Sequence, residues 1–273
     1  MLYKACVFGN PVSQSKSPFI HEEFAKQFDI KFAYSKASPE IEAFTSAANE
    51  FLADPDVLGA NITVPFKEQA YQYVDELSPH AQRAGAVNTF VKRDERIIGD
   101  NTDGIGLIQD LLRNKVKLKG ARVLLIGAGG AAKGALPALI DAQVASVHIY
   151  NRTVERARDL LLNLSEDGDC QLSVYEDEEN FDLIINATSL SLQEKVPSLP
   201  DFIYGESVVC YDMVYLNKPT SFLRHAKKAG CKVCIDGLGM LVGQAAQSFY
   251  LWFGKMPDVE PVLVKLRKAL QAQ

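Results

Sequence analysis

Short apolar runs alternate along nearly the whole chain with longer segments in which apolar residues recur at helical spacing. The apolar runs predict buried strands, and the longer segments predict helices. The predicted strands are Tyr3–Gly9, Val57–Thr63, Val87–Lys92, Arg96–Ile98, Arg122–Ile126, Ser146–Tyr150, Leu183–Asn186, Ser207–Asp212 and Lys232–Ile235. The predicted helices are Ser17–Phe28 with Ser17 as N-cap, a helix opened by Pro65, and Asp103–Asn114, Ala131–Asp141, Val154–Leu164, Thr220–Lys228, Met240–Phe253 and Glu260–Leu270.

This alternation predicts an α/β fold, because strands separated by helices form a sheet that helices cover on both faces. The rhythm is most regular from Arg122 onwards, which predicts a parallel sheet there. The polar run Asp-Asn-Thr-Asp-Gly at 100–104 separates this sheet from an earlier one, and a return of the chain is expected near 237–239. We therefore expect one domain of residues 1–103 plus 239–273 and a second domain of residues 104–238.

Charge and hydropathy narrow the class of protein. The 273 residues carry 29 basic and 34 acidic side chains, a net charge of -5 that argues against a nucleic-acid partner. No apolar run approaches the ~18 residues of a membrane-spanning helix. The first residues lack the pattern of a secretion signal, so we expect a cytoplasmic protein.

Five cysteines are present, at positions 6, 170, 210, 231 and 234. Cys231 and Cys234 have the spacing of a metal or redox pair, but neither a second such pair nor a nearby histidine accompanies them. We interpret them as small buried side chains of a strand and expect no metal site. Reduced cysteines agree with a cytoplasmic location.

The segment VLLIGAGGAA matches the fingerprint G-x-G-x-x-G/A in its required setting, after a strand and before a helix. Gly127 allows the tight turn, Gly129 lets the backbone approach a pyrophosphate, and Ala132 lets the helix lie close to the strand. The amides at the start of the helix favour a phosphate group. We predict a Rossmann-type domain whose pyrophosphate site consists of Gly127, Ala128, Gly129, Gly130 and Ala131.

The end of the following strand predicts which dinucleotide binds. An NAD site usually carries a carboxylate there for the ribose hydroxyls, whereas SVHIYNRT ends in Asn151, Arg152 and Thr153. Arg152 is a cation suited to a 2′-phosphate, and Arg156 lies one turn into the next helix. We therefore predict NADP as the cofactor, although Arg152 could also be an ordinary solvated arginine.

Several polar residues of the first domain stand at predicted strand ends, where open α/β sheets bind ligands. Each also has an ordinary structural explanation, such as a helix cap for Ser17 or Asp103 or a solvated side chain for Lys67. Together, hydroxyl and amide groups suit a polyhydroxylated substrate, and one lysine with one aspartate suits proton transfer. The residues concerned are Ser15, Ser17, Asn61, Thr63, Lys67, Asn88 and Asp103.

A series of motifs runs over almost the whole length of the chain: GNPVSQSKSP, GANITVPFK, AGAVNT, GDNTDG, IGAGGAAKG, NRT, INATS, YDMVY and DGLGMLVGQA. In these motifs and in their order, the chain resembles the shikimate dehydrogenase family. The resemblance implies an N-terminal α/β substrate domain followed by a Rossmann-type NADP-binding domain. It also implies an oxidoreductase that catalyses the reversible NADP-dependent reduction of 3-dehydroshikimate to shikimate, in aromatic amino acid biosynthesis.

The resemblance assigns a role to each residue that matches a motif. Lys67 and Asp103 match the catalytic pair. The implied substrate residues are Ser15 and Ser17, which hold the carboxylate, and Asn61, Thr63, Asn88, Tyr215 and Gln244. The implied cofactor residues are Gly127–Ala131 at the pyrophosphate, Asn151, Arg152, Thr153 and Arg156 at the 2′-phosphate, and Thr188, Met213 and Gly237 beside the nicotinamide half.

Two departures from the family pattern stand out. Relatives often have a histidine where this chain has Gln14, and a glycine shortly after the motif NATS, where this chain continues Leu190-Ser191-Leu192. The second departure predicts another path for the loop Thr188–Leu192. Two alternatives stay open: a quinate/shikimate dehydrogenase of broader substrate or cofactor range, and a ligand-binding protein on a dead enzyme scaffold. The sequence also leaves open whether the protein is a monomer or a homodimer.

Overall fold

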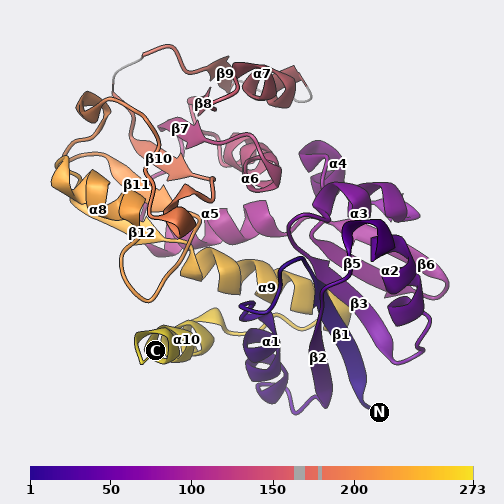
Figure 1. Cartoon of the computed structure of the whole chain (residues 1–273). Coiled ribbons are helices and arrows are strands. Elements are labelled where there is room, and N and C mark those ends of the chain that lie inside the picture. Colours follow the sequence, from indigo (N-terminus) through magenta and orange to yellow (C-terminus); the bar gives the residue numbers. More distant parts are fainter. Residues whose placement is uncertain (163–169, 178–179, 273) are drawn as a thin grey trace. The chain divides into compact units, whose positions relative to one another are not determined.

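The computed structural model describes residues 1–162, 170–177 and 180–272, and the chain divides into two compact units (Figure 1). Unit 1 comprises residues 1–106 and 242–266, and unit 2 comprises residues 107–241 and 267–273. The chain passes from one unit to the other within α5 (Asp103–Arg113), α9 (Leu238–Phe253) and α10 (Val259–Gln271). The domain limits at 103 and 239 stay a prediction, and the last residues of the chain group with unit 2.

Unit 1 contains a mixed sheet of six strands in the order β2-β1-β3-β5-β6-β4. β1 pairs in parallel with β2 and β3, whereas β5 is antiparallel to both β3 and β6. β5 and β6 form a hairpin whose turn includes Asp94. The strands are β1 (Tyr3–Phe8), β2 (Phe32–Ala37), β3 (Val57–Ile62), β4 (Glu76–Leu77), β5 (Thr89–Arg93) and β6 (Arg96–Asp100).

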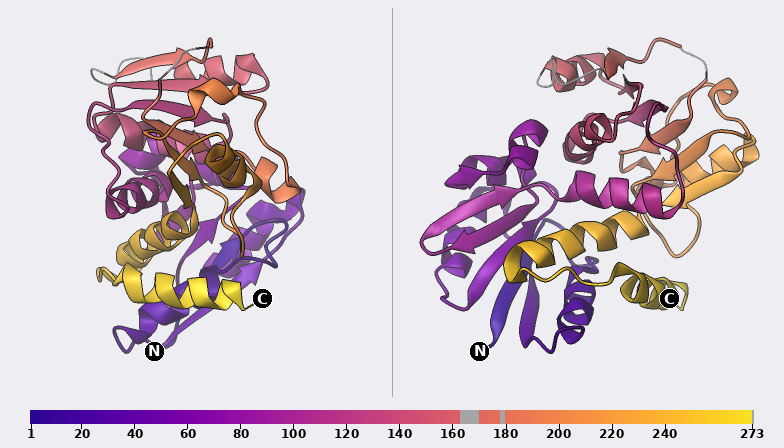
Figure 2. Two further views of the ribbon diagram at one scale, coloured as in Figure 1. Left: turned by 90° about the vertical axis from the view of Figure 1, so that its left-hand side faces the viewer. Right: turned by 180° about the vertical axis from the view of Figure 1, so that it is seen from behind.

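Helices cover both faces of this sheet. On one face, Phe44, Phe66 and Ala81 from α2 (Phe44–Leu52), the start of α3 (Lys67–Tyr73) and α4 (Pro79–Ala84) join the core cluster of Phe8 and Ala60. On the other face, Trp252 of α9 packs with Ala5, Val7 and Tyr34, and α1 (Ser17–Lys26) lies beside β2 (Figure 2). Alternate residues of β1 thus enter opposite cores, as the two-residue period of a strand requires.

Unit 2 contains a sheet of six strands, all parallel, in the order β12-β11-β10-β7-β8-β9. This is the Rossmann order, and the strand order reverses between β7 and β10, where such sheets bind ligands. The predicted α/β class is therefore confirmed. The strands are β7 (Arg122–Ile126), β8 (Ser146–Tyr150), β9 (Gln171–Val174), β10 (Leu183–Asn186), β11 (Val209–Asp212) and β12 (Val233–Asp236).

Apolar side chains of the parallel strands point alternately to two cores. Leu125 packs with residues of α5, α6 (Gly130–Asp141) and α7 (Val154–Leu162), while Leu124 packs with residues of α8 (Ser221–Lys228). Both leucines are fully buried. A strand buried on both faces reads as a continuous apolar run, which explains why VLLI was recognisable in the sequence.

Some elements differ from the prediction. Hydrophobic patterning did not reveal β2, α2, β4, α4 and β9. β4 and α4 have only two and six residues, and three of the six residues of β2 are exposed. The N-cap of α1 is Lys16, so the assignment of Ser17 as N-cap was wrong. The last two residues of the helix predicted over 154–164 lie outside the described residues.

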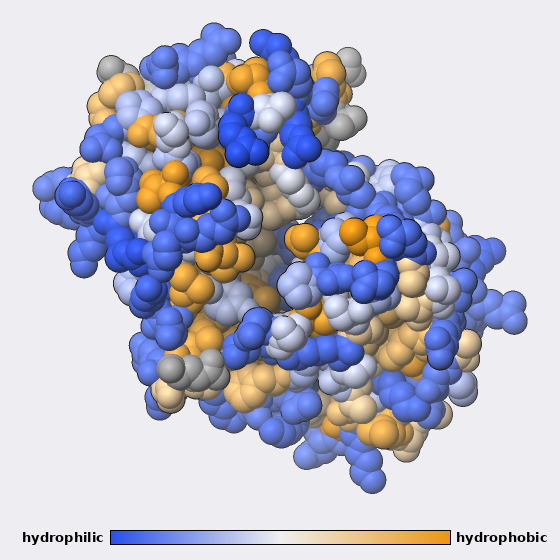
Figure 3. Space-filling model, viewed as in Figure 1, coloured by the Kyte–Doolittle hydropathy of each residue, from blue (hydrophilic) through white to orange (hydrophobic). Residues whose placement is uncertain are grey.

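The face of the molecule shown in Figure 3 is largely hydrophilic, with apolar residues interspersed. Single exposed apolar side chains such as Leu2, Val64 and Phe202 are usual for a folded chain. Within the described ranges, no helix is long and apolar enough to cross a membrane.

His21 of α1 is the one histidine in the core of unit 1 among the described residues. It stacks on Tyr34 with ring centroids 4.5 Å apart, and its Nε2 lies 3.1 Å from Asn61 Oδ1. Its Nδ1 is buried without a hydrogen-bond partner in the described part of the chain. Burial lowers the pKa of His21 from 6.5 to about 3, and the bond to Asn61 opposes this only partly. His21 is therefore neutral at neutral pH.

We predict that His21 makes the folding stability depend on pH below about 6.5. In the unfolded chain the histidine takes up a proton near its ordinary pKa of 6.5, whereas in the folded chain it does so only near 3. The stability from a neutral His21 is therefore complete above pH 6.5 and is lost as the pH falls towards 3, by an amount on the order of a few kcal/mol. Denaturant unfolding between pH 7 and pH 4.5 measures this loss.

The variant His21→Gln should show a shallower loss of stability over this range than the parent, because glutamine does not titrate. His80→Gln, at a histidine whose side chain is 51% exposed, is the matched control and should follow the parent. Identical slopes for the parent and His21→Gln would contradict the assignment.

Candidate active site

Lys67 and Asp103 form an ion pair in unit 1. Lys67 is the first residue of α3 and Asp103 the first of α5, and Lys67 Nζ donates to Asp103 Oδ2. The two side chains are 15% and 9% exposed, so the pair is largely shielded while it still reaches the surface. The structure thus brings together the two residues predicted to be the catalytic pair.

Asn88 holds the second oxygen of Asp103. Its Nδ2 donates to Asp103 Oδ1 over 2.8 Å and to Thr102 Oγ1 over 3.0 Å. Its Oδ1 accepts the backbone N–H of Thr102 at 2.9 Å. The backbone N–H of Asp103 in turn donates to Asn101 Oδ1 at 3.1 Å. The carboxylate therefore has a fixed orientation, with one oxygen left to Lys67.

Backbone pairing explains why these segments meet. The N–H of Val87 donates to the carbonyl of Lys67 over 3.0 Å, and the N–H of Asn88 donates to the carbonyl of Asp100 over 3.0 Å. The second bond extends the β5–β6 ladder, in which Thr89 opposes Asp100, and the first ties the same segment to the start of α3. The end of this ladder thus carries Asn88, Asp103 and the start of α3 at one place.

Asn61, a predicted substrate residue, lies in a buried cluster of hydroxyl groups. Its Oδ1 accepts from Tyr34 Oη at 2.7 Å and is bonded to His21, and its Nδ2 donates to Ser248 Oγ at 2.9 Å and Thr89 Oγ1 at 3.2 Å. Both polar atoms of Asn61 therefore have partners within unit 1. A contact between Asn61 and substrate stays a prediction. In such a contact, an amide atom of Asn61 would bond the substrate in addition to a partner that it already has.

Ser15, Ser17, Thr63 and Gln244 complete the predicted substrate residues of unit 1. Ser15 Oγ lies 3.2 Å from Ser17 Oγ and accepts the backbone N–H of Ser17 at 3.3 Å. Thr63 follows β3, and its methyl group leaves no room for a side chain on Gly9. Gln244 Oε1 lies 3.5 Å from Thr102 Oγ1, next to the group that holds Asn88. Their substrate contacts stay predictions.

Sequence reasoning missed the hydroxyl groups that link these side chains. Thr89 Oγ1 donates to Asn88 Oδ1 at 2.9 Å, and Ser248 Oγ lies 2.9 Å from Thr89 Oγ1 and 3.4 Å from Thr102 Oγ1. Thr89 belongs to the motif AGAVNT and Thr102 to the motif GDNTDG, and these positions could have marked them as site residues. Ser248 lies in an apolar stretch of α9 far along the chain, and nothing in its neighbourhood marked it.

The glycine turn in unit 2 has the geometry that its sequence predicted. Gly127 follows β7 with φ +112°, and its N–H donates to the carbonyl of Tyr150 over 2.7 Å. A Cβ on Gly127 would lie 3.0 Å from Thr188 Cγ2, whereas a Cβ on Gly129 would meet nothing. Gly129 is the N-cap of α6, and because it has no side chain, it leaves the first amides of the helix uncapped. The turn therefore presents open backbone at the start of a helix, which suits a pyrophosphate.

Asn151, Arg152, Thr153 and Arg156 surround the end of β8, the strand beside β7. Asn151 Nδ2 donates to the carbonyl of Thr153 over 2.7 Å, which shapes the turn into α7. Arg152 and Arg156 are exposed, and neither forms an ion pair with any residue that the structure describes. Two uncompensated guanidinium groups at this strand end suit a phosphate.

Thr188, Met213 and Gly237 follow β10, β11 and β12. Thr188 Oγ1 donates to Asn186 Oδ1 at 2.7 Å, the N–H of Met213 donates to the carbonyl of Asn186 at 2.9 Å, and a Cβ on Gly237 would lie 2.1 Å from the carbonyl oxygen of Met213. The predicted nicotinamide residues thus meet at three neighbouring strand ends. Tyr215 lies two residues after Met213, in unit 2. Burial raises its pKa to about 12, and its place in the substrate pocket stays a prediction.

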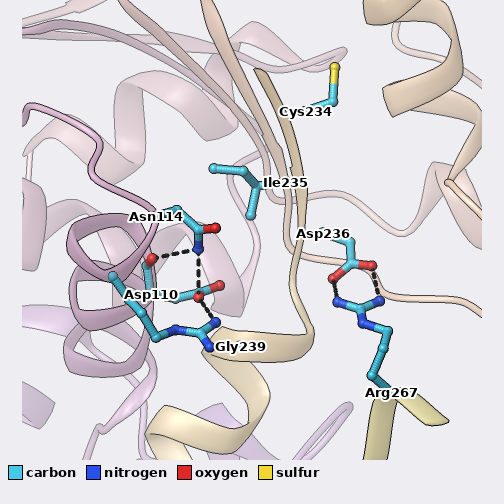
Figure 4. A pocket seen from close by; sticks show the side chains of 8 residues that line it. Asp110, Asn114, Cys234, Ile235, Asp236, Gly239 and Arg267 are labelled. Carbon is cyan, nitrogen blue, oxygen red and sulfur yellow. Dashed lines mark hydrogen bonds and ion pairs between the residues drawn. The ribbon is translucent and has the colours of Figure 1, made fainter. Parts of the chain in front are cut away.

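A polar pocket of about 220 Å³ lies elsewhere in unit 2, between α5, β12, the start of α9 and α10 (Figure 4). Asp236 accepts two bonds from Arg267, and Asp110 accepts from Arg113 and, at 3.0 Å, from Asn114. Each arginine faces a carboxylate, so the lining is electrically balanced. This pocket was not predicted, and it includes none of the predicted site residues.

Within the described residues no group of three or more histidine, cysteine, aspartate or glutamate side chains could hold a metal ion. All five cysteines are free thiols. Cys231 is buried, with its sulfur 3.4 Å from that of Cys210, but it precedes β12. Cys234 lies in β12 and is only partly buried. The interpretation of both cysteines as buried residues of one strand was therefore wrong in part.

A Rossmann sheet with an open glycine turn and basic side chains at the next strand end, joined to a unit with a shielded lysine–aspartate pair, defines a dinucleotide-dependent oxidoreductase. Family models match the chain in three stretches: the shikimate dehydrogenase substrate binding domain at residues 7–90, shikimate/quinate 5-dehydrogenase at residues 110–194, and the shikimate 5′-dehydrogenase C-terminal domain at residues 237–266. The chain belongs to the shikimate dehydrogenase family.

Individual relatives agree with this membership. A shikimate dehydrogenase (NADP⁺) of Vibrio cholerae is 48% identical over 267 residues, which cover 97% of this chain and 96% of that protein. The crystal structure of an Ael1 enzyme from Pseudomonas putida matches with a TM-score of 0.90 at 37% identity, over 97% of this chain and 98% of that one. Shikimate 5-dehydrogenase from Thermus thermophilus, in complex with NADP(H) and shikimate, matches with a TM-score of 0.88 at 34% identity, over 99% and 100%.

We predict that Gly127→Ala weakens cofactor binding. Alanine at φ +112° costs about 1–2 kcal/mol, and its methyl group would also displace Thr188. Gly230→Ala is a matched control, because Gly230 has φ +109° and a Cβ there would meet only Gly205 Cα at 3.9 Å. Both variants should lose similar stability in thermal unfolding.

In titration calorimetry, only Gly127→Ala should bind NADP⁺ more weakly than the parent. Equal NADP⁺ affinity of the two variants would remove the turn from the cofactor site.

Proposed function

We propose that this protein is an NADP-dependent shikimate dehydrogenase, which catalyses the reversible reduction of 3-dehydroshikimate to shikimate. The observation that carries the proposal is the Lys67–Asp103 pair, because its geometry suits proton transfer at a carbonyl or hydroxyl oxygen. The family membership supports the substrate. The activity places the enzyme in aromatic amino acid biosynthesis.

Lys67 acts on the oxygen that changes its bonding. In the reduction, its ammonium group stabilises the negative charge that grows on the carbonyl oxygen and then donates the proton. In the oxidation of shikimate, the neutral amine accepts the hydroxyl proton. Asp103 orients the lysine through Oδ2, and Asn88 keeps the carboxylate in that orientation. The scheme needs no metal ion, because Lys67 stabilises the charge on the oxygen.

The remaining polar side chains of unit 1 bind the substrate. The hydroxyl groups of Ser15 and Ser17 suit the carboxylate of shikimate, because both can donate to it. Amide and hydroxyl groups of Asn61, Thr63, Asn88 and Gln244 suit the ring hydroxyls. Tyr215, which belongs to unit 2, is a substrate residue on the family resemblance alone. Together, the residues of unit 1 hold the ring in one orientation.

NADP(H) supplies or accepts the hydride when it is bound. The open turn from Gly127 to Ala131 would hold its pyrophosphate, and Asn151, Arg152, Thr153 and Arg156 its 2′-phosphate. Thr188, Met213 and Gly237 would flank its nicotinamide half. The fit rests on the unobstructed backbone at Gly129 and the two exposed arginines.

A quinate/shikimate dehydrogenase is the second candidate, and the family model that spans residues 110–194 includes both substrates in its description. Steady-state rates with shikimate or quinate, each with NADP⁺ or NAD⁺, separate the candidates. We expect turnover with shikimate and NADP⁺ to exceed the other three combinations. Absence of turnover in all four would leave a ligand-binding protein on an enzyme scaffold.

We also propose that the protein is a cytoplasmic monomer or homodimer. Five free cysteines agree with a reducing compartment. Light scattering distinguishes the two oligomeric states, and activity in the membrane or periplasmic fraction of a bacterial cell would contradict the location.

Lys67→Ala should lower kcat by about 10²–10⁴-fold, because it removes both the proton donor and the positive charge. The affinity for NADP⁺ should change little. Gln69→Ala serves as the control, since Gln69 lies on the same helix and its side chain bonds only the exposed carbonyl of Ile41. Steady-state kinetics and NADP⁺ titrations check both variants, and an equal loss of cofactor binding would contradict the role of Lys67.

Arg152→Ala should weaken NADP⁺ binding by about 10–100-fold, the value of one hydrogen bond between charged groups. The affinity for NAD⁺ should stay near that of the parent, because NAD⁺ lacks the 2′-phosphate. Arg158→Ala changes an exposed arginine of the following helix, α7, that lies outside the predicted site, and it should affect neither cofactor. Parallel losses for NADP⁺ and NAD⁺ would refute the assignment.

A further inference from the structure

Asp212, the last residue of β11, is a fully buried carboxylate whose hydrogen-bond partners among the described residues are all uncharged. Its Oδ1 accepts from Asn186 Nδ2 and from the backbone N–H of Val214, each at 3.1 Å. Its Oδ2 accepts from Ser191 Oγ at 2.6 Å and from Thr220 Oγ1 at 2.5 Å. We call Asp212 with Asn186, Ser191, Val214 and Thr220 the Asp212 network.

The four donors come from three different segments. Asn186 and Ser191 precede and follow Thr188, Val214 follows Met213, and Thr220 is the N-cap of α8. Burial raises the pKa of Asp212, and the four donors oppose that shift. A buried carboxylate with this many donors is used to join segments, because each donor left unpaired would be costly.

The Asp212 network controls the position of Thr188 in particular. Asn186 Oδ1 accepts both the N–H of Thr188 at 3.1 Å and its Oγ1 at 2.7 Å, while Asn186 Nδ2 is fixed by Asp212. Ser191, which donates to Asp212, lies in the short helix Leu190–Gln193 and is fully buried. This chain therefore uses Ser191, at the point where the loop departs from the family pattern, to close the loop onto Asp212.

The strand order shows what these loops face. The turn at Gly127 follows β7, the exposed arginines follow β8 on one side of it, and Thr188 and Met213 follow β10 and β11 on the other side. A dinucleotide whose pyrophosphate lies at the turn and whose 2′-phosphate lies at Arg152 must direct its nicotinamide half towards β10 and β11.

We propose that Asp212 is a positioning residue for the nicotinamide half of the cofactor, and that Ser191 is the side chain through which it holds the Thr188–Leu192 loop. This inference rests on the proposed function. Asp212 does not touch the reacting atoms. It fixes Thr188 through Asn186 and Met213 through the neighbouring Val214, so that both are in place before the nicotinamide arrives.

The test compares two ligands that differ only in this half: NADP⁺, and 2′-phosphoadenosine diphosphate ribose, which lacks the nicotinamide. Ser191→Ala removes one donor to Asp212. Ser221→Ala is the matched control, because Ser221 is also buried and donates to the carbonyl of Lys195 at 2.8 Å without contacting Asp212. Thermal unfolding should show comparable, small losses for the two variants.

Ser191→Ala should bind NADP⁺ on the order of tenfold more weakly than the parent, with less than a twofold change for the ligand without nicotinamide. Its kcat for shikimate oxidation should also fall, whereas Ser221→Ala should match the parent in all three measurements. Thr220→Ser, which keeps the hydroxyl, should bind NADP⁺ as the parent does, and Thr220→Val should resemble Ser191→Ala.

Two results would overturn the inference alone: a Ser191→Ala variant indistinguishable from Ser221→Ala, or equal losses for both ligands, which would indicate a general structural role. A parent protein that does not oxidise shikimate with NADP⁺ would overturn the proposed function and the inference with it. The parent and the variants thus distinguish the two failures.

Discussion

The ion pair between Lys67 and Asp103 depends on a third residue that carries no charge. Asp103 could swing between several partners, but Asn88 occupies Oδ1 and Asn101 holds the backbone N–H, so that Oδ2 remains for Lys67. Because β5 begins and β6 ends at this place, the fold itself sets the separation of the two charged groups. A lysine held at one position can meet a reacting oxygen without first reorganising, and such preorganisation is the main source of electrostatic catalysis.

Unit 2 applies the same principle with a buried carboxylate. Asp110 and Asp212 both lie inside this unit, but they serve different purposes. Asp110 accepts from Tyr211 Oη at 2.7 Å, a bond that ties α5 to β11, and it also accepts from Arg113 of its own helix. Asp212 accepts only from uncharged donors and ties together the loops at the strand ends. Unit 2 thus contains one buried aspartate with a charged partner, Asp110, and one held by uncharged donors, Asp212, which lies at the strand ends where the cofactor is expected.

Much of this arrangement could be predicted from the sequence, since local signals marked it. Gly127 and Gly129 stand in a fingerprint whose backbone geometry has few alternatives, and VLLI directly before it is typical of a strand buried on both faces. Lys67 and Asp103 were recognisable through their motifs, although spacing alone left a solvated lysine and a helix cap as alternatives. Residues of this kind can be predicted because the neighbouring sequence determines their role.

Other parts depend on contacts that close only in the folded chain. Ser248 reaches Asn61 from a helix 187 positions away, and Ser191 looked like a departure until its bond to Asp212 was visible. The strand β2 has three clearly exposed residues and no apolar alternation, so its position is set by its parallel pairing with β1. Hydrophobic patterning carries no information on such partners.

A double-mutant cycle on the central pair tests the account most directly. It compares kcat for shikimate oxidation with NADP⁺ in the parent, Lys67→Ala, Asp103→Ala and the double variant. If Asp103 acts through Lys67, the double variant should be about as slow as Lys67→Ala alone, because the aspartate has nothing left to orient. Losses that multiply in the double variant would show that the two residues act independently, and would contradict the account.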